Sequence, residues 1–264
     1  MMVRKLVVLV LALPCLPFMV GGQQAAQMVN DEQTAHERAV AAIKKRDGRV
    51  TEELRMGKPF VMVELQGTEL TDNDLPFVLN GLVGVQILDL RGTHVTGASF
   101  VHVKAHNDLE RLYLHDREVD DNALGHLKEL HALQELFLGG CGVTDAGLAH
   151  LAGIKSLTKL SLGSNKIGDK GLEHLKALTA LEWLHLSSTE VGDAGLSNLL
   201  GLKNLEYLDL YCTNVSDIGL NHLKGLTGLR ELYLTNSRVT QTGVDALQKS
   251  LPKAKIVFKP KANN

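Results

Sequence analysis

The chain has 264 residues, of which 44% are hydrophobic and only 4% aromatic, and its formal net charge is −2. With so few aromatic residues, the chain cannot build an ordinary core around Phe and Trp. Leucine must therefore fill the interior. The near-neutral charge gives no electrostatic basis for binding DNA or RNA, which usually requires a basic patch. We therefore expect no nucleic-acid partner.

Residues 1–22 have the pattern of a secretory signal peptide. Arg4 and Lys5 precede an apolar stretch, residues 6–20, which is shorter than the roughly 20 residues that a membrane-spanning helix needs. Gly22 closes a small-residue cleavage zone. We expect cleavage there, no stable membrane span afterwards, and a secreted, periplasmic or cell-surface location. The alternative is an uncleaved membrane anchor.

Residues 23–59 form an N-terminal segment that is expected to seal one end of the molecule. Within it, residues 31–47 suit an amphipathic capping helix that Gly48 can end, whereas residues 23–30 are expected to lack regular structure. A strand-like stretch over residues 49–54 follows. Atypical end units of this kind are needed wherever a repeated structure would otherwise expose its apolar interior.

A pattern of 24 residues then recurs seven times in strict phase, after a degenerate first copy at residues 60–84. The fourth and sixth positions of every repeat are leucine, and the eleventh is β-branched. Side chains two apart share one face of a strand, whereas the apolar positions 16 and 19 share one face of a helix. The repeats begin at Val85, Leu109, Leu133, Leu157, Leu181, Leu205 and Leu229.

The frame L-x-x-L-x-L-x-x-[T/N/C]-x-V, continued as in Val143-Thr144-Asp145-Ala146-Gly147-Leu148, resembles the leucine-rich-repeat family. Its subtype is similar to that of F-box-associated and exported bacterial repeat proteins. The resemblance covers residues 60–258 and implies an α/β fold. That fold is a right-handed solenoid, or horseshoe, with a parallel β-sheet on the concave face and helices on the convex face. A polar tail, residues 259–264, follows.

Several small or polar positions also recur. The ninth position is mostly Thr, Asn, Ser or Cys, and the resemblance implies that these side chains bond the turn backbone inside the coil. An aspartate precedes the helical stretch in five repeats and is expected to cap that helix. Position 15 stays small, which we expect to let the helix approach the sheet. The five aspartates are Asp121, Asp145, Asp169, Asp193 and Asp217.

These aspartates, and the histidines that recur at position 18, also raise the question of a metal site. Metal ligands converge on one point, whereas residues 24 apart spread along the coil. Capping and packing explain both rows, so we expect no metal and no other cofactor.

Function is expected at positions three, five and seven, which face outward on the concave side. All four tyrosines and the only tryptophan lie there, and exposed aromatic residues are common interface anchors. Five separate rings would bury roughly 750–1,250 Å², against about 800 Å² per partner in a standard interface. The alternative is that aromatic residues merely suit strands. The predicted binding residues are Tyr113, Phe137, Trp183, His185, Tyr207, Asp209, Tyr211 and Tyr233.

The resemblance therefore favours a non-enzymatic module that binds another protein on its concave face. A glycan is an alternative ligand, since aromatic rows can stack sugars, and a substrate-receptor role like that of F-box repeat proteins is another. Ser161, His185 and Asp209 occupy position five of consecutive repeats in the order of a nucleophilic relay. An open sheet offers no evident oxyanion donors, so we expect no enzyme activity. A monomer is expected.

Overall fold

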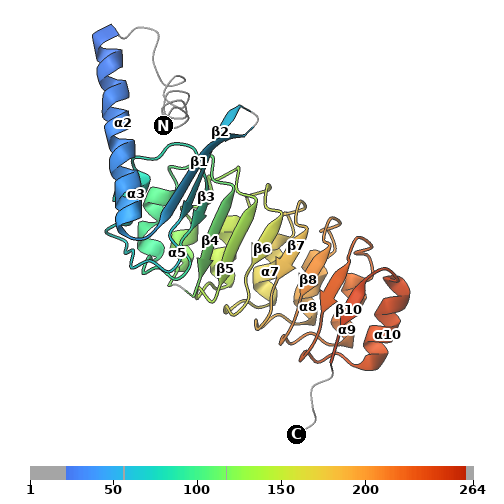
Figure 1. The fold of residues 1–264 in the computed structure, drawn as a ribbon. Coiled ribbons are helices and arrows are strands. Elements are labelled where there is room, and N and C mark those ends of the chain that lie inside the picture. The colour runs from blue at the N-terminus through green and yellow to red at the C-terminus, as the bar shows by residue number, and fades with distance from the viewer. Residues whose placement is uncertain (1–21, 56, 117, 260–264) are drawn as a thin grey trace.

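The computed structural model describes residues 22–55, 57–116 and 118–259, and Figure 1 shows them as an elongated, gently curved coil. The strands lie side by side in chain order, and the short helices line the opposite side of the coil (Figure 1). Residues 1–21 of the predicted signal segment, Arg117 and residues 260–264 of the polar tail lie outside the described residues.

The described residues form one ten-stranded sheet whose strands follow the order of the chain. Strands β2 to β10 pair in parallel, and residues opposite each other from β3 onward are 24 apart, as Leu160 and Leu184 are. Only β1 runs antiparallel, to β2. The strands are β1 Arg49–Arg55, β2 Lys58–Glu64, β3 Val85–Asp89, β4 Arg111–His115, β5 Glu135–Gly139, β6 Lys159–Ser161, β7 Trp183–His185, β8 Tyr207–Asp209, β9 Glu231–Tyr233 and β10 Lys255–Val257.

Short helices connect the strands, one repeat after another, and their apolar faces pack on the leucines of the sheet. The predicted solenoid with a parallel sheet and a helical face is confirmed. The helices are α2 Gly22–Lys45, α3 Leu75–Leu79, η2 Gly97–Ser99, α4 Phe100–Val103, α5 Asp121–Leu124, α6 Asp145–Leu148, η3 Ala149–Leu151, α7 Asp169–Leu175, α8 Asp193–Leu196, η4 Ser197–Leu199, α9 Asp217–Leu223 and α10 Gln241–Ser250.

The interior is a continuous column of leucine. The leucines at positions four and six, such as Leu184 and Leu186, are buried in every repeat, as is the β-branched position eleven. Position nine is buried as well in the six repeats where the structure describes it, and the hydroxyls of Thr189 and Thr213 donate to the carbonyls of Leu186 and Leu210 at 2.7 and 2.8 Å. These bonds satisfy backbone groups that would otherwise be buried without partners.

The N-terminal helix is longer than the sequence predicted. Helix α2 begins at Gly22, so residues 23–30 are helical and the expectation that they lack regular structure is wrong. Its end also differs, because Asp47 rather than Gly48 adopts the left-handed conformation, with a φ of 59°. The N–H of Gly48 bonds to the carbonyl of Ile43 at 3.0 Å, which closes a Schellman-type cap.

The recurring aspartates do not cap their own helices as expected. Each begins its helix, and its carboxylate accepts hydrogen bonds from the next repeat instead. The backbone N–H and the hydroxyl of Ser216 donate to Asp193 at 2.7 and 2.6 Å. Ser216 in turn accepts from the N–H of Ile218 and caps the helix, as Asp120 and Thr144 do in their repeats. Glycine precedes the aspartate in the other two repeats and supplies no side-chain cap. The same inter-repeat link is made by Asp121, Asp145, Asp169 and Asp217.

This link, rather than helix–sheet packing, explains the small residue at position 15. A Cβ on Gly195 would lie 2.5 Å from Asp169 Oδ1, and one on Gly219 would lie 2.4 Å from Asp193 Oδ1. Position 15 departs from glycine twice. Ser99 fits beside Asp72 because its hydroxyl donates to the carboxylate at 2.6 Å. Gly97 replaces the aspartate in its repeat, and the following repeat carries Ala123 at position 15.

We predict that Gly195→Ala destabilises the fold by about 1–3 kcal/mol, because the methyl group would collide with Asp169. Gly153→Ala is the matched control, since a Cβ there meets nothing within 4 Å, and it should stabilise by about 0.4–1 kcal/mol through the unfolded chain. Urea unfolding with a shared slope measures both changes. In a chain that already carries Asp169→Gly, Gly195→Ala should destabilise the fold less, because the colliding carboxylate is gone. Equal effects of Gly195→Ala and Gly153→Ala would contradict the explanation.

Candidate functional site

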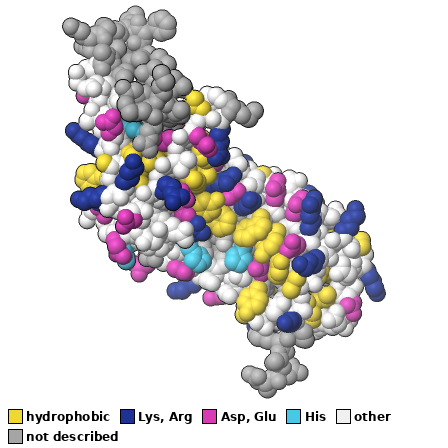
Figure 2. Space-filling model, viewed as in Figure 1, with side chains coloured by type: hydrophobic (Ala, Val, Ile, Leu, Met, Phe, Trp, Pro, Cys, Tyr) yellow, Lys and Arg dark blue, Asp and Glu magenta, His cyan; other side chains and the backbone are white. Residues whose placement is uncertain are grey.

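The predicted binding residues lie together on the concave face, on strands β4 to β9 and just beyond β8. Figure 2 shows hydrophobic side chains gathered in a band over these strands. The residues are outward-facing because they alternate with the buried leucines along each strand, as Trp183 and His185 alternate with Leu184. The 24-residue register then brings equivalent positions of successive repeats side by side.

Five rings form an unbroken line of contacts, which we call the aromatic row: Tyr113, Phe137, Trp183, Tyr207 and Tyr233. The successive centroid distances along it are 5.0, 5.8, 4.9 and 5.3 Å. Trp183 and Tyr207 are stacked, with 16° between their planes. Offset stacked and tilted rings at these distances attract one another beyond the area they bury. The row crosses five strand spacings, which amounts to about 24 Å.

The row bridges β6 because that strand carries a small residue. Ser161 holds position five of β6, opposite Phe137 on one side and His185 on the other, whereas Trp183 lies opposite Lys159. Because the Ser161 side chain is short, the rings of Phe137 and Trp183 approach diagonally across the strand, with their centroids 5.8 Å apart. A hollow of about 580 Å³ opens beside this gap, and Arg91, Ser161 and His185 are among its lining residues. The hollow has the size of a small ligand site but is open to solvent along the sheet.

His185 is held in place by three polar neighbours. Its Nδ1 lies 3.0 Å from Ser161 Oγ, and its Nε2 lies 2.6 Å from Ser187 Oγ and 3.4 Å from Asp209 Oδ2. Burial lowers the pKa of His185 below 6.5, the charge of Asp209 opposes that shift, and His115 adds to it. The imidazole is therefore neutral near pH 7.

The three residues whose order in the sequence resembles a nucleophilic relay do contact one another, with His185 between Ser161 and Asp209. However, Ser161 is only 7% exposed. The hydroxyl of Ser187 also forms a hydrogen bond with Nε2 of His185, the ring nitrogen that faces Asp209. The arrangement fixes the orientation of the imidazole beside Trp183, whose ring centroid lies 5.7 Å away.

Carboxylates accompany the tyrosines. Tyr113 donates to Glu135 at 3.0 Å, and Tyr233 donates to Glu231 at 2.6 Å. Burial and the charge of Asp209 raise the pKa of Tyr207 to about 12. Two carboxylates, those of Asp209 and Glu231, therefore lie beside the C-terminal half of the row.

Some of the site was not foreseen, and one predicted residue lies at its margin. Arg91, Glu135 and Ser187 contact the predicted residues but were not selected, because the sequence criterion sought rings rather than their polar neighbours. All three hold outward positions of the repeat, which was the available signal. Tyr211 is 40% exposed, and its hydroxyl accepts from Asn236 at 3.0 Å at the edge of the row.

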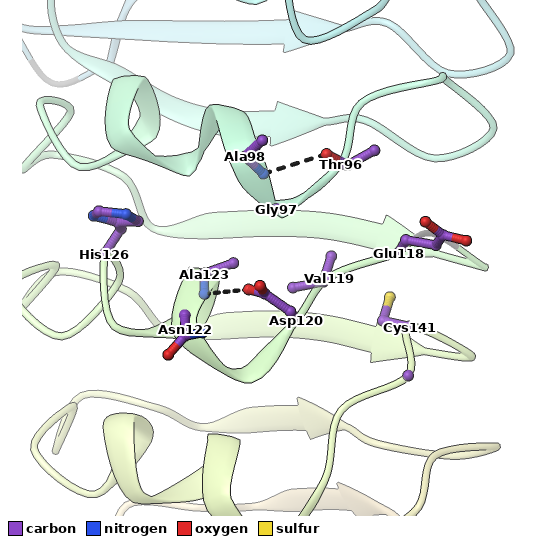
Figure 3. Close-up of a pocket in the computed structure, with 11 residues that line it drawn as sticks. Thr96, Gly97, Ala98, Glu118, Val119, Asp120, Asn122, Ala123, His126 and Cys141 are labelled. Carbon is purple, nitrogen blue, oxygen red and sulfur yellow. Dashed lines mark hydrogen bonds between the residues drawn. The ribbon is translucent and has the colours of Figure 1, made fainter.

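A second hollow, of about 560 Å³, lies on the helical side of the sheet. Figure 3 shows its lining, with Thr96 and Asp120 each accepting a bond from the backbone of its own helix. It coincides with Gly97, where the aspartate link between repeats is missing. The interruption accounts for this hollow, which brings no paired acid and base together.

Comparison with known proteins agrees with this geometry. Two family models described as leucine rich repeat match residues 154–176 and 179–239. The chain is a leucine-rich repeat protein. An internalin C2 from Listeria monocytogenes is similar in structure, with 18% identity, a TM-score of 0.51, and coverage of 85% of this chain and 92% of the internalin.

A plant peptide hormone receptor, RGFR1, solved in complex with RGF2, is also similar to this leucine-rich repeat protein. The match has 18% identity, a TM-score of 0.51 and 72% coverage of this chain, which spans only 31% of the receptor chain. At such identities the likeness shows the fold. The comparison with curated proteins found no match. Among the described residues, helix length and hydropathy identify no membrane-spanning helix.

We predict that the imidazole of His185 titrates below pH 6.5, because burial disfavours its charged form. Asp209→Asn should lower this midpoint further, since it removes the attractive charge, whereas His115→Gln should raise it by removing a repulsive one. NMR titration of the ring proton resonances measures all three. A midpoint at or above 6.5, or a rise in Asp209→Asn, would contradict the description.

Proposed function

We propose that this leucine-rich repeat protein is a non-enzymatic module that binds another protein on its concave face. The observation that carries the proposal is the aromatic row, five rings in continuous contact on the outward face of the sheet. Rigid aromatic side chains offer large contact area with little loss of conformational freedom on binding. No other outward surface formed by the described residues carries a tyrosine or tryptophan.

The contact must extend beyond the rings. The buried area expected from the sequence assumed five separate rings. In the structure each ring is already half-buried, partly against its neighbours. The row alone therefore falls short of the about 800 Å² that one partner contributes to a standard interface. Flanking polar residues such as Arg91, Lys159 and Glu231 would supply the polar rim that surrounds an apolar centre.

The structural neighbours support a protein ligand and an exported location. The receptor that resembles this chain is described as a peptide hormone receptor in complex with RGF2, so the same fold occurs in a receptor with a peptide ligand. Together with the signal-like sequence of residues 1–22, this favours a secreted, periplasmic or cell-surface protein whose partner is exported as well.

Sugar binding is less well supported by the geometry. Stacking of a sugar requires an open ring face, but Trp183 has Phe137 on one side and Tyr207 on the other. Trp183, the largest ring of the row, therefore has no free face on which a sugar could stack. A substrate-receptor role would need an intracellular location, against which the N-terminal sequence argues.

We predict that Trp183→Ala and Tyr207→Ala each weaken binding of a captured partner about 30-fold or more, as truncation of central interface anchors does. The partner is captured from the exported fraction with the whole chain, and affinities are measured by calorimetry. Phe77→Ala is the control, because Phe77 lies on α3 and is 71% exposed. Unchanged affinity in both row variants would remove the proposal.

We predict that a fluorophosphonate probe leaves Ser161 unmodified, because Ser161 is only 7% exposed and the reagent cannot reach its hydroxyl. Mass spectrometry of the treated chain measures this. An adduct on Ser161 that disappears in His185→Gln would show a working relay and contradict the non-enzymatic proposal.

A further inference from the structure

One carboxylate on the concave face has aromatic side chains on all four sides. Asp209 ends β8, with Tyr207 and Tyr211 two residues away along the chain. Strand pairing places His185 of β7 and Tyr233 of β9 directly opposite it. We call these five residues the aromatic cross. The side chain of Asp209 is 14% exposed, so its carboxylate is a recessed polar centre among rings.

The described residues provide no basic partner for this carboxylate. Asp209 Oδ1 accepts the N–H of Tyr211 at 2.8 Å, and its only ion-pair contact among them is His185 at 3.4 Å. His185 is neutral near pH 7 because burial lowers its pKa. Two lysines lie two strands away in register, and neither is opposite Asp209. Lys255 is exposed and lies opposite Glu231, and Lys159 donates to Glu135 at 3.0 Å.

The other end of the aromatic row shows the same carboxylate position with its cation supplied. Asp89 also holds position five of its repeat, and Arg91 Nε donates to its Oδ1 at 2.9 Å. The guanidinium carbon of Arg91 lies 5.3 Å from the ring centroid of Tyr113. One guanidinium is thus held between a carboxylate and an aromatic ring. In the repeat of Asp209, the residue equivalent to Arg91 is Tyr211.

We infer that the partner presents a cationic side chain, arginine or lysine, which enters the aromatic cross and pairs with Asp209. The inference rests on the proposed function and names what its partner must carry. A cation among aromatic rings gains from their quadrupoles, and more so where water is excluded. A recessed carboxylate adds a charge-assisted hydrogen bond and fixes the register of the bound segment.

The neighbours of His185 add a pH dependence to this pairing. Ser161, Ser187 and Asp209 contact its ring, and His115 faces it from β4. When acid protonates His185, the chain supplies its own cation beside Asp209. Affinity for the partner's cation should therefore fall as the pH drops through the His185 titration.

The test is selection of binders from a displayed library of random heptapeptides, carried out on the whole chain and on Asp209→Asn. We expect arginine or lysine to be enriched at one peptide position on the unaltered chain and to lose that enrichment on Asp209→Asn. Asp245→Asn, which removes an exposed carboxylate from α10, is the matched control and should keep the enrichment. Trp183 is the only tryptophan, so its fluorescence reports binding at the site.

A selected peptide then enters a double-mutant cycle. Replacing its cationic residue by a neutral isostere, citrulline or norleucine, should weaken binding about threefold to thirtyfold on the unaltered chain and should change little on Asp209→Asn. Peptides that need Trp183 but show no cationic preference, or a cycle without coupling, would overturn this inference and leave the proposed function standing. A selection that yields no binder on the unaltered chain would count against both.

Discussion

The structure depends on one constraint, the pairing of each residue of the parallel strands with the residue 24 positions away. Every backbone group of a strand then bonds to a neighbouring repeat, and every side chain stands beside its equivalent. The leucines at positions four and six merge into a column, and the residues between them form a second, outward array. A shift of one residue in a single repeat would exchange the two arrays locally, because side chains alternate along a strand.

The helical side is held in the same register by a different bond. The carboxylate of an aspartate such as Asp169 accepts the N–H that begins the turn of the next repeat, and a glycine there makes room for it. The acceptor and the residue at position 15 belong to different repeats, so the two positions are coupled. Where Gly97 replaces the aspartate, the next repeat carries Ala123, and where Asp72 supplies the carboxylate, the next repeat carries Ser99, whose hydroxyl donates to it at 2.6 Å.

Periodicity made the fold predictable, and it located the residues of the concave face, because a strict repeat converts sequence spacing into spatial position. Periodicity could not show which partner each polar side chain bonds to. The aspartates were expected to cap their own helices, since proximity in sequence suggested it, but the carboxylates turn toward the next repeat. Helix α2 was predicted too short because its first turns lack the apolar pattern that marks a packed helix. Arg91 and Ser187 were missed because their role lies in holding neighbours, which only geometry reveals.

The gap in the aspartate series has a consequence for how the molecule comes apart. Solenoids are stabilised by contacts between adjacent repeats, so the junction after Gly97, which lacks the carboxylate bond, is the weak joint of the chain. Local unfolding at this junction would separate α2 and strands β1 to β3 as a unit, while strands β4 to β10 stay paired. All five rings of the aromatic row lie C-terminal to that junction. The N-terminal end of the coil could therefore unfold locally while the surface proposed for recognition stays intact.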